Sequence, residues 1–430
     1  MEIETYDLIQ KNIRLIDVLR MHKKLDKTSL AQIMNVTWPT ISSYVNSLIA
    51  TKILTKEGNL LSINKSYGIL FGISVGSAQI KICALDMMLQ PLNKDNFQSL
   101  IQGDDIFATQ KKYMKEHNTT IEYYLYSETP PNEKDLILTL NEIFNSIKKI
   151  IETQSINVLS IGICFTGAVD KKRKRIIKAS NLPFLNNLNF EEGILLRNYL
   201  DFFETRDINI AIENNSIAAG IAEKWSLYNN ETIKGEYNIN NKYKDKKNIV
   251  SIYLGAGLGL SVIQNNHIHY QNDSHSQMDG IGHLEVPNFS ENENVFQDKC
   301  PCGRDTCLDY RIRHDVFEQT FEEFKTKTSA DINDFFKDKT DKQLLMGKYI
   351  GYLVNIINSL LNPDIIIITG KLHLAIDHLW GAIQQKRNES YYNDSEKNCL
   401  LIKSNLGAIA PAIGAAISGY YDKFKSDIEW

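Results

Sequence analysis

The sequence has little cysteine, little proline and no long hydrophobic run. Six cysteines in 430 residues are too few for a disulfide-held scaffold, and nine prolines with 23 glycines exclude a fibrous or low-complexity protein. The longest uncharged stretch, residues 248–272, contains three glycines and a polar tail, so it does not predict a membrane helix of about 20 apolar residues. We therefore expect neither a disulfide framework nor a membrane partner.

The first ten residues also lack the apolar core of a signal peptide. They read MEIETYDLIQ and carry three acidic residues. Three of the cysteines, Cys83, Cys164 and Cys399, lie in apolar runs and are expected to be buried thiols. These features predict a cytoplasmic protein.

Charge is unevenly distributed along a chain of otherwise ordinary globular composition. With 43% hydrophobic and 23% charged residues, the 430-residue chain is expected to form two or three domains of about 150 residues each. Residues 1–65 hold nine Lys and Arg against six Asp and Glu, whereas the rest of the chain has more acidic than basic residues. The net charge of −4 argues against a protein that coats nucleic acid, but the sequence predicts a small basic head on a larger acidic body.

The head has the pattern of a winged helix-turn-helix. Apolar residues recur at helical spacing in three segments, residues 9–20, 29–35 and 38–54. A short hairpin is expected to follow at residues 58–64. In this plan the third helix enters the major groove of double-stranded DNA. The alternative is a three-helix packing domain without a role in DNA binding.

Capping residues support the second and third of these helices. Thr28 or Ser29 is expected to begin the second helix, with Leu30, Ile33 and Met34 on its inner face. Thr37 is expected to begin the third helix, because a proline follows within its first turn.

The solvent face of the third helix carries side chains that can bond base edges or phosphates. They are Thr37, Trp38, Thr40, Ser42, Ser43 and Asn46. The helix has no basic residue before Lys52, so phosphate contacts are expected from neighbouring lysines. These are Lys23, Lys24, Lys27, Lys52 and Lys56.

The body alternates strands with helices, which predicts α/β layers in two lobes. Hairpins are expected at 67–86 and 248–263, and single strands at 158–165, 208–212, 363–370 and 399–403. Helices are expected at 132–153 and 213–225. Residues 95–131 are expected to form a partly irregular insertion, and residues 229–248 a surface loop.

A glycine-rich turn, GAGLG at 255–259, follows one of these strands. Its backbone amides could cradle a phosphate. A dinucleotide site requires a helix after the glycines, whereas this turn continues as a strand. A phosphate cradle and a plain glycine hairpin both remain open.

The strongest chemical signal is CPCGRDTC at 300–307, with His283 upstream. Three thiolates from Cys300, Cys302 and Cys307, together with one imidazole, complete a tetrahedral Zn²⁺ shell, so we expect a structural zinc site. The alternatives are three unrelated thiols or a redox pair.

These pieces together resemble the ROK family, which contains sugar kinases and sugar-responsive transcriptional repressors. The resemblance rests on GH followed by CxCGxxxC, and on four further segments: TGAVD with NLPF (166–184), ENNSIAAG (213–220), GAGLG (255–259) and NPDIIIITG (362–370). It implies a winged helix-turn-helix joined to a two-lobed sugar-kinase-type body of the actin and ribonuclease-H type. The expected domains are 1–66, then 67–185 with a C-terminal helix at 405–430, then 186–404.

Two departures from the family pattern argue against a kinase. The resemblance places Ser74 where the kinases have an Asp that handles metal and phosphate, and Asn215 where they have the Asp that acts as general base. An amide cannot accept the proton of a sugar hydroxyl, and losing the base alone costs about 10²–10⁴-fold in rate. We therefore expect no enzymatic activity.

The resemblance also implies an altered sugar pocket. Gly280 stands in place of a sugar-binding Glu, for which Asp279 is a conceivable substitute. The remaining candidates for effector contacts are Asn181, Asn214, Asn215, His283 and Asp309. For Asn181 and Asn214 the alternative is ordinary turn and helix-start chemistry.

The leading hypothesis is a DNA-binding repressor, acting as a homodimer or dimer of dimers, that responds to a carbohydrate or related metabolite. A sugar kinase that retains a DNA-binding domain is the second hypothesis. The third is a regulator whose body only dimerises and binds a protein partner. The effector, the operator and the sign of regulation do not follow from the sequence.

Overall fold

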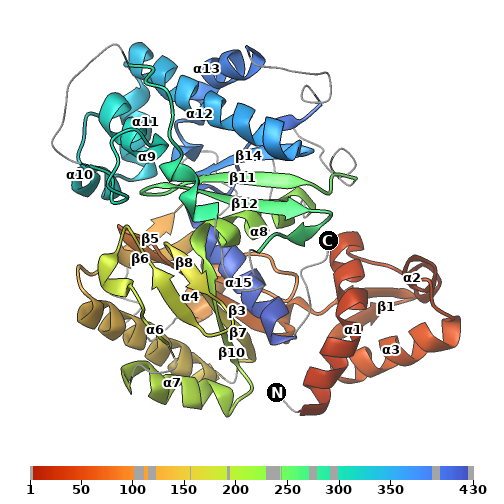
Figure 1. Cartoon of the computed structure of the whole chain (residues 1–430). Coiled ribbons are helices and arrows are strands. Elements are labelled where there is room, and N and C mark those ends of the chain that lie inside the picture. Colours follow the sequence, from red (N-terminus) through yellow and green to blue (C-terminus); the bar gives the residue numbers. More distant parts are fainter. Residues whose placement is uncertain are drawn as a thin grey trace.

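Two mixed β-sheets with a layer of helices between them form the body, and a small helical head projects from one side (Figure 1). The fold comes from a computed structural model. It describes residues 3–100, 111–114, 123–154, 156–190, 194–228, 243, 245–270, 278–290, 299–389 and 398–424.

The head consists of three helices and a hairpin, as the sequence predicts. These are α1 (Ile3–His22), α2 (Lys27–Met34), α3 (Trp38–Ala50), β1 (Leu54–Glu57) and β2 (Leu60–Ile63). The hairpin strands pair antiparallel, and Leu61 of β2 also bonds Leu25 in the linker between α1 and α2. The hairpin is thereby fastened to the helices as a wing.

Three details of the head differ from the sequence prediction. Asp26, not Thr28 or Ser29, caps α2 by accepting a hydrogen bond from the Ser29 amide. Helix α2 buries Leu30 and Ala31, while Ile33 stays 42% exposed. Helix α3 ends at Ala50 instead of residue 54, because Lys52 takes a left-handed backbone conformation (φ 62°).

The first sheet carries six strands in the order β10-β7-β3-β4-β6-β5. Their bounds are β10 (Asn209–Asn214), β7 (Val158–Phe165), β3 (Ile69–Val75), β4 (Gln79–Leu85), β6 (Tyr123–Glu128) and β5 (Lys111–Met114). The first three strands run parallel and the hairpin of β3 and β4 is antiparallel. Side chains on one face of this sheet pack against α6 (Glu133–Gln154) and α7 (Ile194–Glu204).

Two expectations about this lobe are corrected. The segment 95–131, expected to be a partly irregular insertion, contributes β5 and β6 to the sheet, and β6 pairs with β4. Strand β10 also belongs to this sheet, so the first sheet extends past residue 185, where the sequence placed the lobe boundary. The expected surface loop at 229–248 lies mostly outside the described residues.

The second sheet carries five strands in the order β13-β12-β11-β14-β15. They span β13 (His267–Ile268), β12 (Leu258–Gln264), β11 (Ile249–Leu254), β14 (Ile365–Gly370) and β15 (Leu400–Lys403). Alternate residues of β11 and β14 face opposite sides, so Val250 and Ile366 pack with α12 (Thr340–Leu361) and α13 (Ile376–Asn388).

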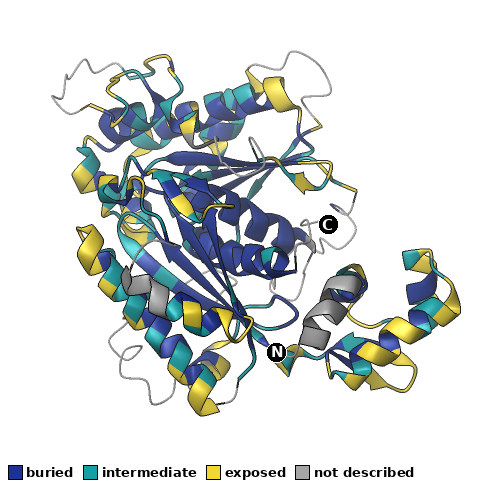
Figure 2. Cartoon of the chain, turned by 60° about the horizontal axis from the view of Figure 1, so that its bottom comes forward, coloured by how far each residue is buried: buried dark blue, intermediate teal, exposed yellow. Residues whose placement is uncertain are grey.

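Helices α8 (Asn215–Tyr228) and α15 (Ala410–Lys423) form the layer between the sheets (Figure 1). Both are buried over nearly all of their described length (Figure 2). Glycines allow this close approach, because a Cβ at Gly72 or Gly162 of the first sheet would lie 1.9 or 1.8 Å from a backbone oxygen of α15. A Cβ at Gly414 of α15 would lie 1.6 Å from the backbone oxygen of Ala218 in α8.

The head is joined to the body through α1 and the far end of α15. Arg20 of α1 is 3% exposed, donates to the backbone oxygen of Met87 at 3.1 Å, and lies over the Tyr420 ring at 4.5 Å. Asp17 pairs with Arg20 and accepts a hydrogen bond from the Tyr421 hydroxyl at 3.0 Å. A partly buried ion pair and two tyrosines therefore fix α1 on the body.

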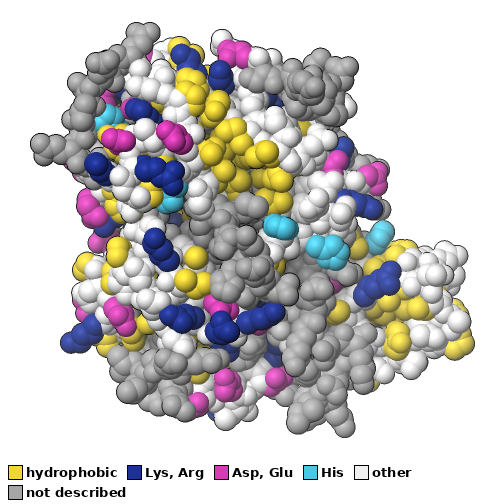
Figure 3. Space-filling view, in the orientation of Figure 1, with side chains coloured by type: hydrophobic (Ala, Val, Ile, Leu, Met, Phe, Trp, Pro, Cys, Tyr) yellow, Lys and Arg dark blue, Asp and Glu magenta, His cyan; other side chains and the backbone are white. Residues whose placement is uncertain are grey.

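Helix α12 is long and apolar enough to cross a membrane by length and composition alone. Half of its most apolar stretch is buried, and the helix packs on α13 as a core helix. Leu344, Leu360 and Leu361 remain exposed on it, and hydrophobic side chains gather on the upper lobe in the space-filling view (Figure 3).

The glycine contacts of α15 predict a strong substitution effect. Gly414→Ala places a methyl group against the Ala218 backbone, which cannot move without shifting α8, so we expect a loss of about 3 kcal/mol or more in unfolding free energy. Gly381→Ala is the matched control, because a Cβ at this exposed helical position meets nothing within 4 Å. It should leave stability unchanged or raise it by up to about 1 kcal/mol. Urea unfolding checks both, and equal stability of the two variants would contradict the packing argument.

Candidate functional site

Two adjacent cavities open between the two sheets. The smaller, about 60 Å³ and here called the polar pocket, is lined by Asn181, Asn215, His283, Asp309 and the glycine turn after β11. The larger cavity has a volume of about 470 Å³. The two share Thr166, Asn215 and Tyr253 in their linings, so they adjoin one another.

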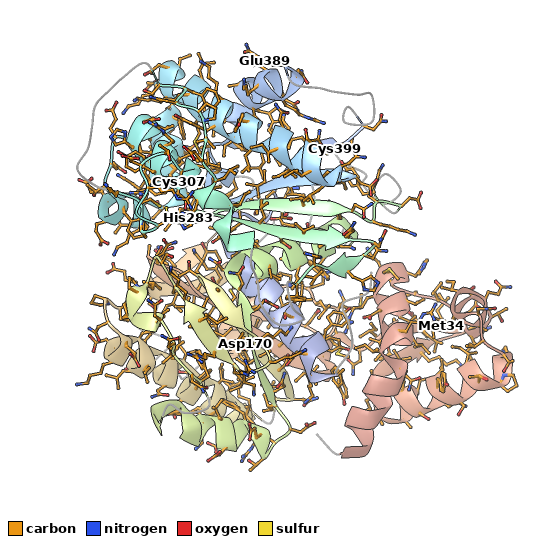
Figure 4. All side chains as sticks on the ribbon, in the orientation of Figure 1. Met34, Asp170, His283, Cys307, Glu389 and Cys399 are labelled. Atoms are coloured by element: carbon orange, nitrogen blue, oxygen red, sulfur yellow. The ribbon has the colours of Figure 1, made fainter. Side chains whose placement is uncertain are left out.

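A cluster of four metal-ligating side chains borders the polar pocket. His283 ends η4 (Met278–His283), and Cys307 lies directly before α9 (Leu308–Arg311). With Cys300 and Cys302 their ligand atoms all lie within 4.8 Å of one another. Figure 4 shows His283 and Cys307 side by side in the upper lobe.

The distances in this cluster fit a tetrahedral ion. Sulfur ligands on a tetrahedral Zn²⁺, with bonds of about 2.3 Å, lie about 3.8 Å apart. The Cys302 and Cys307 sulfur atoms are 3.9 Å apart, and the His283 Nδ1 lies 3.4 Å from the Cys300 sulfur. The structure thus brings together all four ligands that the sequence predicts.

Asp309 connects this cluster to the polar pocket, because it follows Cys307 by two residues. Its Oδ1 accepts a hydrogen bond from the Leu258 amide at 2.8 Å, and burial raises the pKa of its carboxyl group. Two glycines make room for this carboxylate. A Cβ at Gly257 would lie 2.7 Å from Asp309 Oδ2, and one at Gly282 would lie 2.5 Å from both carboxylate oxygens.

The glycine turn therefore makes room for the Asp309 carboxylate and donates a hydrogen bond to it from the Leu258 amide. This use agrees with the plain-hairpin alternative for residues 255–259, since β11 and β12 pair antiparallel on either side. Gly280, where the family pattern has a Glu, faces open space, because a Cβ there would meet nothing within 4 Å. Asp279 lies beside it in η4, and its side chain is outside the described part of the chain.

The three candidate asparagines separate into two groups. Asn181 and Asn215 line the polar pocket, and Asn181 Nδ2 lies 3.5 Å from the Thr166 hydroxyl. Asn214 is fully buried and outside both linings. Its Oδ1 accepts the Ser216 and Ile217 amides at 2.7 and 3.0 Å, and its Nδ2 donates to the Gly167 backbone oxygen at 2.8 Å. Asn214 thus starts α8, as the helix-start alternative expected, rather than facing the pocket.

The prediction that the chain lacks kinase activity rests on Ser74 and Asn215. Ser74 is 5% exposed and bonds the Cys164 thiol, so it points into the core. Asn215 lines both cavities and stands where they meet. The described side chains at these two positions are thus a hydroxyl and an amide, and neither carries a negative charge.

The outer face of α3 presents most of the predicted DNA-contacting residues to solvent. Thr37, Trp38, Ser43 and Asn46 are exposed, and Trp38 is 57% exposed; Thr40 and Ser42 are partly covered. Thr37 and Thr40 bond each other through their hydroxyl groups at 2.8 Å.

One lysine from α2 reaches onto this face. Lys27 Nζ donates to Ser42 Oγ at 3.0 Å and to Asn46 Oδ1 at 2.9 Å, and it lies 5.8 Å from the centre of the Trp38 ring. Helix α3 therefore gains a positive charge that its own sequence lacks. Lys52 and Lys56 are exposed at the end of α3 and on the wing, whereas Lys24 is paired with Glu57 at 2.8 Å.

Comparison with known proteins agrees with this architecture. The ROK family profile matches residues 230–418. The xylose repressors of Bacillus spizizenii (strain ATCC 23059 / NRRL B-14472 / W23) and Bacillus subtilis (strain 168) are each 22% identical over 424 residues, which covers 94% of this chain and 93% of each repressor.

This chain is therefore similar to ROK family proteins, through the family profile over residues 230–418 and through xylose repressors that match 94% of its length. A crystal structure of a ROK family transcriptional regulator, a homolog of the E. coli MLC protein, matches this chain with a TM-score of 0.64 at 16% identity, covering 93% of both chains. A ROK family glucokinase from Streptomyces griseus, in complex with glucose and AMPPNP, matches with a TM-score of 0.54 at 16% identity, covering 82% of this chain and 99% of that one.

Sequence reasoning missed the residues that line the larger cavity. Lys81 of β4 and Lys371 of η6 (Lys371–His373) both line it, although they come from different lobes and lie far apart in the sequence. A lone lysine in the apolar strand 79–85 was the signal for Lys81. No local pattern marks Lys371.

The fit of Asp309 against Gly282 predicts a local substitution effect. Gly282→Ala puts a methyl group 2.5 Å from the carboxylate, which must then give up its bond to the Leu258 amide, so we expect a loss of about 1–3 kcal/mol in unfolding free energy. For Gly280→Ala, two residues away, the unfolding free energy should stay within about 0.5 kcal/mol of that of the parent. Urea unfolding of the two variants checks this, and an equal effect at both glycines would rule out the special role of Gly282.

Proposed function

We propose that this protein is a DNA-binding transcriptional regulator of the ROK family, acting as a repressor, whose body binds a carbohydrate or related small metabolite in the polar pocket. The observation that carries the DNA-binding part is the exposed polar face of α3 with the Lys27 ammonium held on it. The full-length match to xylose repressors, over 94% of this chain, supports the same conclusion.

The geometry of the head suits insertion of α3 into a major groove. Lys27 uses two of its three N–H donors on Ser42 and Asn46, which leaves one for a phosphate oxygen. Lys52, just after the end of α3, and Lys56, on the wing, are exposed and can contact phosphates of the DNA backbone. Such phosphate contacts fix the register of the protein on DNA, while the polar side chains of α3 read the bases.

DNA titrations test this proposal. Fluorescence anisotropy with DNA from upstream of the protein's own reading frame should show binding tighter than to random DNA, and one sugar of a panel should weaken it. Lys56→Gln should weaken binding to all sequences and lower the slope of log K against log salt by about 0.9, the value for one lost phosphate contact. Lys27→Gln should reduce the preference for the upstream DNA as well, because Ser42 and Asn46 lose the group that orients them.

Lys348→Gln is the matched control, since Lys348 is an exposed lysine of α12, on the body rather than the head. It should change neither affinity nor salt slope. Binding no tighter than to random DNA, or equal losses in the control and the head variants, would contradict the proposal.

The second part of the proposal is that His283, Cys300, Cys302 and Cys307 hold one structural Zn²⁺. Four protein ligands close the shell, so the ion would order the loop and fix Asp309 at the pocket, without a free position for catalysis. Zinc shells of this kind contribute on the order of 10 kcal/mol to folding of the segment that they tie together.

Metal analysis tests the zinc proposal. Cys302→Ser should lower zinc content from one per chain and lower the melting temperature, because a neutral hydroxyl replaces a thiolate ligand. Cys399→Ser removes a buried thiol far from the cluster, so its zinc content should stay at one per chain whatever its melting temperature. A Cys302→Ser protein that keeps one zinc per chain and melts as the parent does would refute the proposal.

We further propose that the body is catalytically inactive and that the protein works in the cytoplasm as a homodimer or dimer of dimers. The amide of Asn215, at the junction of the two cavities, cannot take a proton from a sugar hydroxyl, which argues against the sugar-kinase alternative. The exposed leucines of α12 offer an apolar surface for self-association.

A further inference from the structure

The larger cavity is a separate feature of the cleft with its own chemistry. Its volume of about 470 Å³ lies in the range of small-molecule sites, and both lobes contribute to its walls. Strand β4 and the turn before it line one side. The other side is formed by η6 and the segment between α10 (Phe321–Lys325) and α11 (Ser329–Phe336).

The lining of this cavity is basic. It includes Lys81, Lys327, Lys371 and His373, and none of the described residues that line it is an aspartate or glutamate. The Lys81 ammonium group forms no hydrogen bond or ion pair with the described residues, although this residue is half-buried. Removing an ammonium group from water without a counter-charge costs free energy. An anion bound in the cavity would offset this cost.

Lys371 faces the same cavity from the second lobe. Its Nζ donates to the backbone oxygen of Lys325 at 3.0 Å, which is a neutral acceptor. Asp331, the carboxylate that most attracts it, is already used at the start of α11, where it accepts hydrogen bonds from the amide and hydroxyl of Thr328 at 2.7 and 2.8 Å.

The charges of the two lysines also act on one another across the cleft. Burial lowers the pKa of Lys81 to about 8, and burial together with the charge of Lys81 lowers the pKa of Lys371 to about 7. Burial, and again the charge of Lys81, lower the pKa of His373 to about 4. An anion placed between the lysines would relieve both the desolvation and the repulsion.

Uncharged polar and aromatic side chains around these lysines could contact the uncharged part of a small anionic ligand. Ser77 and Gln79 lie beside Lys81 in the lining, and Thr328 lies beside Lys327. The rings of Tyr124 and Tyr126, whose centres are 6.4 Å apart, add an aromatic wall with polar tips.

We propose that the larger cavity binds the phosphate monoester of a small metabolite, such as a sugar phosphate, with the phosphate group held between Lys81 and Lys371. The described lining offers no carboxylate to hold Mg²⁺, so a magnesium nucleotide is not the ligand that it fits. This site is additional to the polar pocket of the proposed function, and its occupancy does not depend on DNA binding. Because each lobe supplies one lysine, the ligand would draw the lobes together.

Calorimetric titration of the full-length protein tests the site. The probes are ribose 5-phosphate and glucose 6-phosphate, each without metal, with ribose, glucose, inorganic phosphate and magnesium-ATP alongside. We expect at least one sugar phosphate to bind with Kd below about 1 mM and at least tenfold more tightly than its unphosphorylated sugar, because two charge-assisted contacts hold the phosphate.

Lys81→Met and Lys371→Met should each weaken that binding at least tenfold. Each methionine retains an apolar stem without a charge to desolvate, so the variants should melt at or above the temperature of the parent in the absence of ligand. Lys348→Met, on the exposed face of α12, should bind as the parent does. If either methionine variant melts lower, the corresponding glutamine variant replaces it in the titration.

Three results would overturn the proposal. The first is no binding of either sugar phosphate up to 10 mM (about −2.7 kcal/mol by the affinity scale). The second is binding that survives in both lysine variants. The third is magnesium-ATP binding more tightly than the metal-free sugar phosphates. None of these results bears on the DNA titrations, so the two proposals fail independently.

Discussion

The close contact of α15 with β3, β7 and α8 is the constraint on which the rest of the structure depends. Glycines at Gly72, Gly162 and Gly414 leave no room for side chains at these crossings. Helix α15 is therefore held in one position between the two sheets by close backbone contacts. Its first turn follows the segment 406–409 at the wall of the larger cavity, and its last turn carries Tyr420 and Tyr421 against α1. One element thus connects the wall of the larger cavity with the head, which gives a physical path between them.

The metal cluster and the polar pocket share a second rigid unit. Cys307 leads directly into α9, so fixing its sulfur also fixes Asp309 two residues later. Two glycines, Gly257 and Gly282, leave the space that this carboxylate occupies. A metal ion at the cluster would accordingly affect the polar pocket indirectly. It would fix the position of α9, and with it the Asp309 carboxylate that lines the pocket.

Sequence reasoning succeeded where the signal is local and failed where it is not. The β-branched runs of β3, β4, β11 and β12, joined by glycine-containing turns, predict their hairpins, and cysteine spacing predicts the ligand cluster. Strand β6 was missed because its periodicity is weak, and β10 was given to the other lobe because sheet membership depends on partners far along the chain. Sequence reasoning also missed that Lys81 and Lys371 line one cavity, because nothing in the sequence near either lysine indicates that the other lies across the cleft.

The place of α15 in the chain has a consequence for biosynthesis. All strands of the first sheet have been translated by residue 214, yet the helix that covers its inner face begins only at Ala410. On the ribosome, that face must wait uncovered while the whole second lobe is made, which exposes apolar surface to chaperones and to neighbouring chains. The contacts of Tyr420 and Tyr421 with α1 also form last. A nascent or truncated product would therefore carry a head that is not yet joined to the body through these contacts, so the head becomes fixed on the body only when the last residues of α15 have been made.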